Sequence, residues 1–318
     1  MRDTENNDKT ATVVGAGLIG RGWSIVFASA GWNVRLFDTD ADALAAAPTA
    51  IETQARMMLE HGLLNSTAQV TDRIQIEPDL AAAVAGTRYV QECGPELEEV
   101  KQELFADLDR LAPADAILAS STSAIVASRF TGNLKGRERM LVAHPVNPPH
   151  LVPLVEIAPA EWTAPDTVEK AIQVMEEVGQ TPILVKQEVD GFILNRLQAA
   201  LLNEAVRLVD GGYVSPEDLD KTVRDGLGLR WSFMGPFETI DLNAPAGTRD
   251  YAARYSDFFR RIVPSQSTVP DWQGAAIDSI EGFNREQRDV TEIAERSEWR
   301  DNRLAALRAH KRDVQDKT

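Results

Sequence analysis

Short apolar runs alternate with amphipathic stretches along the first 190 residues. The apolar runs are rich in β-branched and aliphatic side chains, which is typical of buried strands. These runs predict strands at residues 12–14, 33–37, 74–76, 89–93, 116–119, 140–143, 154–158 and 181–185. Helical spacing of apolar residues predicts helices at residues 21–30, 41–62, 66–73, 79–85, 96–111 and 164–179. This alternation predicts a doubly wound α/β domain with a parallel sheet.

The pattern changes near residue 190. Residues 192–209 form a long apolar helical stretch, which follows Asp190 as a candidate cap and ends at Gly211. Another helix is predicted to open at Ser215, where an N-cap serine precedes a proline and two acids. Because no strand is predicted after this point, we expect two domains. Residues 1–190 would form the α/β domain and residues 191–318 an all-helical domain.

A glycine-rich turn joins the first predicted strand to the first predicted helix. It has the pattern G-x-G-x-x-G, with Gly15, Gly17 and Gly20 at its fixed positions and Leu18 and Ile19 between the last two. The first glycine permits a tight turn, the second lets the backbone approach a pyrophosphate, and the third allows close helix–strand packing. The context therefore predicts a Rossmann-type dinucleotide site formed by this segment.

An acidic residue at the end of the second predicted strand selects the dinucleotide. Asp38 can accept hydrogen bonds from both ribose hydroxyls of NAD, whereas it would repel the 2′-phosphate of NADP. The next residues, Thr39 and Asp40, supply no arginine that could reverse this preference. The sequence predicts NAD as cofactor.

Composition narrows the possible partners. The chain has 318 residues and a net charge of −16, which disfavours binding to nucleic acid or to an anionic membrane surface. Its single cysteine can form neither an internal disulfide nor a zinc cluster, so no metal is expected. The chain has no apolar run of membrane-spanning length, and its polar beginning lacks the apolar core of a signal peptide. We therefore expect a cytoplasmic protein without membrane or nucleic-acid partners.

Polar side chains at the carboxyl ends of the later strands are candidates for catalysis, because ligands of doubly wound sheets bind there. Ser123 follows the strand at 116–119, and His144 ends the strand at 140–143. Glu156 is a carboxylate within an otherwise apolar run, so it needs a partner. A glutamate paired with a histidine would form an acid/base dyad, although the spacing alone does not show contact. The other histidines, residues 61, 150 and 310, have ordinary structural explanations.

Two further polar residues stand out in the second domain. Asn195 is polar on the apolar helix predicted at 192–209, where it could equally cap the helix or face solvent. Arg230 lies in a glycine-rich segment expected to be a loop, where arginine could be a surface residue or a clamp for a substrate carboxylate.

The motifs together resemble the 3-hydroxyacyl-CoA dehydrogenase superfamily over roughly residues 11–312. They are G-A-G-L-I-G (15–20), P-E-L-E-E-V-K-Q-E-L-F (95–105), S-S-T-S (120–123), H-P-V-N-P-P (144–149), G-F-I-L-N-R-L (191–197) and G-P-F-E-T (235–239). Within it the sequence is most similar to the L-gulonate 3-dehydrogenases, the lambda-crystallin group. Features of that group are the proline and valine of H-P-V-N-P-P, where the acyl-CoA enzymes usually read H-F-F-N-P, and the W-R-D motif at 299–301.

The resemblance implies roles for individual residues. His144 falls on the catalytic base and Glu156 on its dyad partner, while Ser123 and Asn195 fall on groups that bind the reacting oxygen. In addition, Glu96 and Lys101 fall on positions lining the nicotinamide ribose, Asn147 lies in the N-P motif near the substrate, and Arg230 matches a substrate-carboxylate ligand.

The implied activity is NAD-dependent oxidation of the 3-hydroxyl of a small polar hydroxy acid, with L-gulonate as the expected substrate and 3-dehydro-L-gulonate as the product. Short-chain 3-hydroxyacyl-CoA and L-carnitine remain alternative substrates, since Trp231 and Phe233 could form part of an aromatic cage for a trimethylammonium group. A non-enzymatic, crystallin-like role is disfavoured because all four polar site residues are retained.

The helical domain also suggests self-association. Residues 192–209 are more apolar than a short domain needs for its own core, and similar family members pair through this domain, so we expect a homodimer. The basic tail at 296–318 is expected to be a solvated helix face or a contact between subunits.

Overall fold

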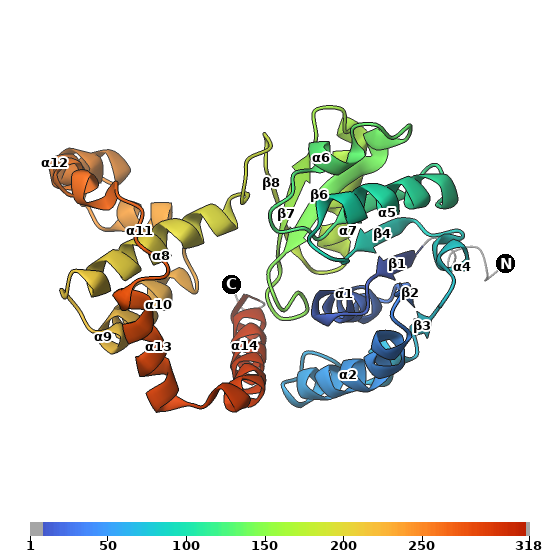
Figure 1. Ribbon diagram of the computed structural model, residues 1–318, viewed down its shortest axis with the longest axis horizontal. Helices are drawn as coiled ribbons and strands as arrows, with labels where there is room; N and C mark the ends of the chain where they lie inside the picture. The colour runs from blue at the N-terminus through green and yellow to red at the C-terminus, as the bar shows by residue number, and fades with distance from the viewer. Residues whose placement is uncertain (1–8, 316–318) are drawn as a thin grey trace. The chain divides into compact units, whose positions relative to one another are not determined.

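A computed structural model describes residues 9–315. The chain divides into two compact units, one comprising Met1–Asn195 with Arg296–Thr318 and the other comprising Arg196–Glu295 (Figure 1). This division differs from the predicted limits of 1–190 and 191–318 in the last helix, which groups with the α/β unit. The reason is burial, because Ala305 of that helix is fully enclosed in the core of the first unit.

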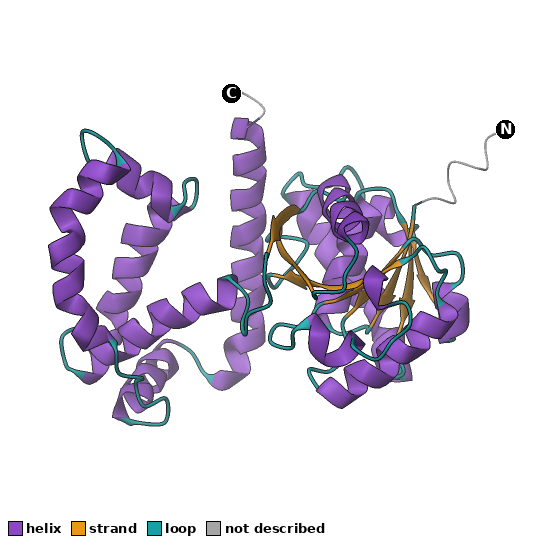
Figure 2. Cartoon of the chain, turned by 90° about the horizontal axis from the view of Figure 1, so that it is seen from above, coloured by secondary structure: helices purple, strands orange, loops and turns teal. Residues whose placement is uncertain are grey.

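The first unit contains a single eight-stranded sheet with helices on both sides (Figure 2). The strands are β1 (Thr10–Val14), β2 (Asn33–Phe37), β3 (Ile74–Ile76), β4 (Tyr89–Glu92), β5 (Ile117–Ser120), β6 (Met140–Pro145), β7 (Leu154–Pro159) and β8 (Thr181–Leu184). Their order is β3-β2-β1-β4-β5-β6-β7-β8. The sheet turns from one direction of winding to the other between β1 and β4, and that point is where such folds bind a dinucleotide.

One pair of strands departs from the parallel pattern. Strand β7 runs antiparallel to β6, while all the other paired strands are parallel. Only residues 146–153 separate β6 from β7, which is too short for a crossover helix, so the chain turns back along its neighbour. This antiparallel pair places His144 directly beside Glu156 in the ladder.

Each face of the sheet carries its own layer of helices and its own core. The helices of the first unit are α1 (Leu18–Ser29), α2 (Ala41–Glu60), α3 (Ala68–Thr71), α4 (Leu80–Val84), α5 (Glu98–Leu111), α6 (Ala127–Thr131) and α7 (Pro165–Glu177), with the last helix α14 (Ile293–Gln315). Buried side chains of α1, α2, α7 and α14 share one core, and those of α4, α5 and α6 share the other. The predicted Rossmann-type α/β fold is confirmed.

The second unit is helical throughout, as the sequence predicts. Its elements are α8 (Leu194–Asp210), which begins at the boundary, α9 (Pro216–Lys221), a π-helical turn η2 (Thr222–Leu227), α10 (Gly228–Trp231), α11 (Pro236–Leu242), α12 (Thr248–Gln266) and α13 (Ala275–Gln287). The prediction of a loop around Arg230 is wrong. Arg230 lies on the short helix α10, which continues directly from η2.

The basic tail, expected to be a solvated helix face or a contact between subunits, instead bonds to loops of the α/β unit. The side chain of Arg308 donates to the carbonyl oxygen of His150, and Arg312 donates to that of Gly62 at 3.0 Å. Helix α14 is therefore packed against the α/β unit rather than being only a solvated face. None of the helices in the described part of the chain combines the length and apolar character that a bilayer crossing requires.

Candidate active site

In the turn between β1 and α1, a side chain would clash with the backbone at Gly15 and Gly20 but has space at Gly17. Gly15 has a φ of +110°, and a Cβ there would lie 2.7 Å from the carbonyl oxygen of Cys93. A Cβ on Gly20 would lie 1.7 Å from the carbonyl oxygen of Gly15, whereas a Cβ on Gly17 would have no neighbour within 4 Å. The two glycines thus serve chain packing, and Gly17 leaves free the side from which a phosphate group can approach.

The first turn of α1 offers unneutralised backbone N–H groups. Its N-cap, Gly17, has no side chain to accept from them, and the first turn contains no acidic residue. Gly17 and Leu18 are exposed, and Ile19 is half-buried. Because a helix N-terminus carries partial positive charge, this turn fits the pyrophosphate of a dinucleotide.

Asp38 is held in place at the end of β2. One carboxylate oxygen accepts from the backbone N–H of Ala16 at 2.6 Å, and the other accepts from that of Asp40 at 2.9 Å. These bonds join the acid to the glycine turn itself. A half-buried carboxylate fixed beside that turn fits the ribose of NAD.

His144 and Glu156 are in contact. The Nδ1 atom of His144 lies 2.8 Å from Oε2 of Glu156, and both side chains are buried. These two residues, twelve positions apart in the sequence, lie directly opposite each other where β6 pairs with β7. A histidine whose Nδ1 is bound by a carboxylate has a fixed ring orientation, and its Nε2 is available for proton transfer.

The second oxygen of Glu156 anchors the start of α8. Oε1 accepts from the backbone N–H groups of Ile193 at 2.8 Å and of Leu194 at 3.0 Å. Burial raises the pKa of Glu156, but the hydrogen bonds from His144 and from the two N–H groups outweigh it, so the pKa lies below its ordinary value. The carboxylate is therefore ionised and links the histidine to the helix that carries Asn195.

Ser123 and Asn195 also meet. The side-chain amide of Asn195 donates to the carbonyl oxygen of Ser123 at 2.9 Å. The backbone N–H of Ser123 donates to Oε1 of Glu96 at 2.9 Å, and the hydroxyl of Thr122 donates to the same oxygen at 2.5 Å. The segment after β5 is thereby fixed by α8 on one side and by Glu96 on the other.

Glu96 and Lys101 belong to a charged network with a third member that sequence reasoning missed. The ammonium group of Lys101 is 3.0 Å from both oxygens of Glu92, which is fully buried, and 3.7 Å from Oε2 of Glu96. Burial raises the pKa of Glu96, but bonds from Thr122 and the charge of Lys101 bring it below its ordinary value. Glu92 is an acid within an apolar strand, which is the same signal that identified Glu156.

The two remaining predicted residues are exposed. Asn147 lies in the loop after β6, and its side chain makes no hydrogen bond with the described residues. Arg230 is exposed on α10 of the second unit.

Comparison with known proteins places this geometry in a family. The model of the 3-hydroxyacyl-CoA dehydrogenase NAD binding domain matches residues 10–189, and that of the family's C-terminal domain matches residues 191–284. The chain belongs to the 3-hydroxyacyl-CoA dehydrogenase family. It is an NAD-dependent oxidoreductase that acts on a CH–OH group. The glycine turn and Asp38 fit this cofactor.

Several relatives are similar over nearly their full length. A lambda-crystallin homolog of Bos taurus is 42% identical, with 93% of both chains covered. An L-carnitine dehydrogenase of Burkholderia mallei is 36% identical, with 92% of this chain and 90% of the relative covered. Among solved structures, an NAD⁺-dependent 5-formyl-3-hydroxy-2-methylpyridine 4-carboxylic acid 5-dehydrogenase has a TM-score of 0.79 at 27% identity, covering 94% of this chain and 97% of that one.

Proposed function

We propose that this dehydrogenase oxidises the 3-hydroxyl of a small polar hydroxy acid, converting L-gulonate to 3-dehydro-L-gulonate. The observation that carries the proposal is the 2.8 Å contact between Nδ1 of His144 and the ionised carboxylate of Glu156. It provides an oriented base at the carboxyl end of β6, the edge of the sheet to which the glycine turn also belongs.

In this mechanism His144 takes the hydroxyl proton on Nε2. Glu156 accepts a hydrogen bond from the Nδ1–H group, fixes the tautomer and stabilises the imidazolium that forms. NAD would be held by the glycine turn and Asp38 and would supply the acceptor for the hydride of the carbon that bears the hydroxyl, so that the alcohol would become a ketone and the hydroxyl proton would pass to His144. Ser123 and Asn195 hold the reacting oxygen through hydrogen bonds, and their mutual contact keeps both at one place.

The other residues position the two molecules that react. We assign Glu96 and Lys101 to the ribose next to the nicotinamide, and the buried Glu92 holds the ammonium group of Lys101 in place through both of its carboxylate oxygens. We assign Asn147 to the substrate, and Arg230 to its carboxylate, since arginine can bind a carboxylate through two hydrogen bonds.

Three observations bear on the substrate. The lambda-crystallin homologs support gulonate, while a carnitine dehydrogenase and a 3-hydroxyacyl-CoA dehydrogenase are similar enough to keep L-carnitine and a short acyl-CoA as candidates. Assays with NAD and L-gulonate, L-3-hydroxybutyrate, L-carnitine or 3-hydroxybutyryl-CoA separate them. We expect the highest kcat/KM for gulonate, and a higher value for carnitine or the CoA ester would refute this assignment.

Substitution of the base tests the mechanism. A positioned base is worth ~10²–10⁴-fold, so His144→Ala should lower kcat by about that factor while leaving the Kd of NADH unchanged. His61→Ala is the matched control, since this half-buried histidine lies outside the predicted site and its side chain bonds to Asn302 at 3.2 Å. Near-normal turnover of His144→Ala would exclude the dyad as the source of catalysis.

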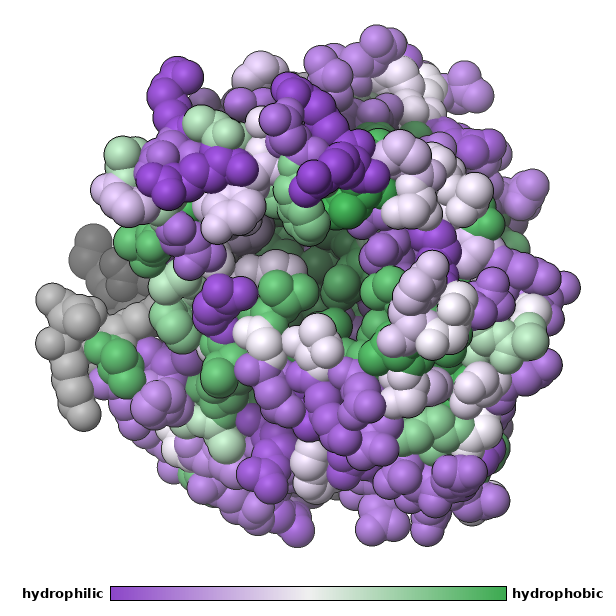
Figure 3. Space-filling model, turned by 90° about the vertical axis from the view of Figure 1, so that its left-hand side faces the viewer, coloured by the Kyte–Doolittle hydropathy of each residue, from purple (hydrophilic) through white to green (hydrophobic). Residues whose placement is uncertain are grey.

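We further propose that the protein forms a homodimer through the second unit. Several large apolar side chains of this unit are exposed in the single chain, among them Phe233 at 70% and Phe237 at 81%. Figure 3 shows apolar residues, in green, around the centre of the face that it draws. Apolar surface of this kind is typical of a protein interface.

A further inference from the structure

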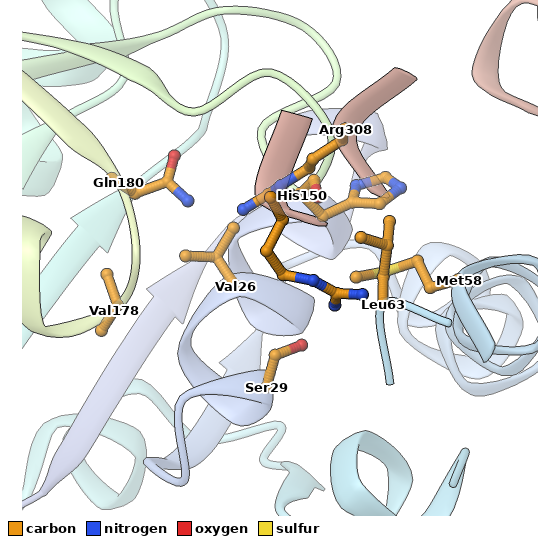
Figure 4. A pocket seen from close by; sticks show the side chains of 9 residues that line it. Val26, Ser29, Met58, Leu63, His150, Val178, Gln180 and Arg308 are labelled. Atoms are coloured by element: carbon orange, nitrogen blue, oxygen red, sulfur yellow. Dashed lines mark hydrogen bonds between the residues drawn. The ribbon is translucent and has the colours of Figure 1, made fainter. Parts of the chain in front are cut away.

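A cavity lies within the first unit, apart from the glycine turn (Figure 4). Its volume is about 150 Å³, and it is lined by Val26, Ser29, Met58, Leu63, His150, Val178, Gln180, Arg308 and Arg312. Ser29 is the last residue of α1, whereas the dinucleotide turn is at the first. At 1.5 Å per residue the two ends of this helix are about 16 Å apart. The cavity is therefore distinct from the cofactor site.

Three polar atoms of side chains that line this cavity have no hydrogen-bond partner among the described residues. They are Oγ of Ser29, Nδ1 of His150 and Oε1 of Gln180. His150 is only 4% exposed and Gln180 only 6%. A buried polar atom without a partner costs about 1–3 kcal/mol, so native structures almost always satisfy such atoms. A polar occupant of the cavity that carries a hydrogen-bond donor would satisfy at least one of them.

Two of these atoms require a hydrogen-bond donor. Nε2 of His150 lies 3.2 Å from Oε1 of Gln54, which accepts, so Nε2 carries the ring hydrogen. Burial and the charge of Arg308 lower the pKa of His150 to about 4, so the ring is neutral and Nδ1 is an acceptor. The carbonyl oxygen of Gln180 is an acceptor as well.

The same cavity carries unneutralised positive charge. Arg308 has no carboxylate within 4.0 Å among the described residues, and its guanidinium donates to the carbonyl oxygen of His150. Burial and the neighbouring charge of Arg312 lower the pKa of Arg308. An adjoining cavity of about 480 Å³ shares both arginines and adds Lys311. Among these groups, Arg312 has a weak carboxylate contact, at 3.3 Å to Asp313.

We propose that this cavity binds a small oxyanion that also carries an O–H group, such as hydrogen phosphate or a short hydroxycarboxylate. Its anionic oxygens would accept from the guanidinium groups, and its O–H would donate to Nδ1 of His150 or Oε1 of Gln180. Water alone could donate to these acceptors but would leave Arg308 without an anionic partner. A cavity of this size has room for a ligand as large as benzene. The anion would tie α14 to α1 and to the segment before β8.

Because the cavity has both hydrogen-bond acceptors and arginines, it should prefer a protonated oxyanion to an unprotonated one of the same shape. Phosphate and sulfate have the same shape, but only phosphate carries a proton at neutral pH. With NADH saturating, so that the dinucleotide site is filled, calorimetric titration should give phosphate a Kd at least about ten-fold lower than that of sulfate. The same comparison between glycerate and propionate tests the hydroxycarboxylate. Equal affinity within both pairs, or no binding, would overturn the proposal.

Variants separate this cavity from any other anion site. Arg308→Gln should abolish the rise in Tm that phosphate causes, whereas Arg303→Gln, on the same helix but stacked near Trp299, should retain it. Gln180→Glu places a fixed negative charge in the cavity and should also abolish the response without depending on the bond from Arg308 to His150. Turnover should be unchanged in all three variants. A phosphate response that persists in Arg308→Gln and Gln180→Glu would contradict the assignment.

Discussion

At the scale of single residues, Glu156 performs two tasks with one side chain. One oxygen binds His144, and the other binds two N–H groups at the start of α8. Its pKa is below the ordinary value of 4.5 because burial is outweighed by these bonds. Folding therefore favours the ionised form. Its contribution to stability is present above the unfolded pKa and is lost as the pH falls through the folded pKa.

Glu156→Gln keeps the size of the side chain and removes its charge. We expect kcat to fall at least about ten-fold, because the imidazolium of His144 loses its stabilising carboxylate. We also expect the loss of stability between pH 5 and pH 3 to be smaller than in the wild type, since the variant has no carboxylate to protonate at this position. Rates from pH 6 to pH 10 and urea unfolding at pH 5 and pH 3 measure both effects. A wild-type rate in the variant would contradict the role of the carboxylate.

Asp38 offers a second test at the residue scale. Asp38→Asn removes the charge that repels a 2′-phosphate and weakens the acceptor for the ribose hydroxyls. We expect kcat/KM for NAD to fall and that for NADP to rise, so that the ratio of the two changes at least about ten-fold, or 1.4 kcal/mol. Asp42→Asn, a change at a nearby exposed acid of α2, is the control. An unchanged ratio would mean that Asp38 does not select the cofactor.

At the scale of elements, the sequence reveals motifs that lie within one short segment, but not which residues of two strands lie opposite each other. The glycine turn is predictable because its three positions lie within six residues of one strand–helix junction. The contact between His144 and Glu156 depends on an antiparallel register that no local pattern reveals. Glu92 was missed because its partner, Lys101, lies on a separate helix, although an acid in an apolar strand was the available signal.

The glycine turn provides a matched pair of substitutions. Gly17→Ala adds a methyl group where no protein atom lies within 4 Å, so Tm should be unchanged while KM for NAD rises. Gly20→Ala places its methyl group 1.7 Å from the carbonyl oxygen of Gly15, so the turn must shift and Tm should fall by several degrees. Thermal unfolding without cofactor and NAD titration check the two outcomes. Equal Tm losses in both variants would show that Gly17 is also a packing position.

At the scale of the whole molecule, the sequence predicts two domains but not the membership of the last helix. The tail at 296–318 looks like a charged, solvated segment because its apolar positions are few. Ala305 enters the core of the first unit, Leu304 packs against that core, and arginines bind backbone carbonyls of distant loops. Long-range contacts of this kind leave almost no periodic signal. The second unit shows the opposite case, with more apolar surface than its own packing uses.

That surface leads to the last prediction. Stable interfaces cover about 800 Å² on each partner and are centred on aromatic and aliphatic side chains, such as Phe233, Phe237 and Leu242 here. We expect the protein, of 34.9 kDa per chain, to behave as a dimer in light scattering at micromolar concentration. Phe233→Ser combined with Phe237→Ser should raise the dimer Kd at least about 100-fold, because truncating central aromatic residues costs several kcal/mol. Leu59→Ser, which alters an exposed apolar residue of α2 in the first unit, should leave the dimer intact. A wild-type monomer, or a dimer unaffected by the double substitution, would exclude this face as the interface.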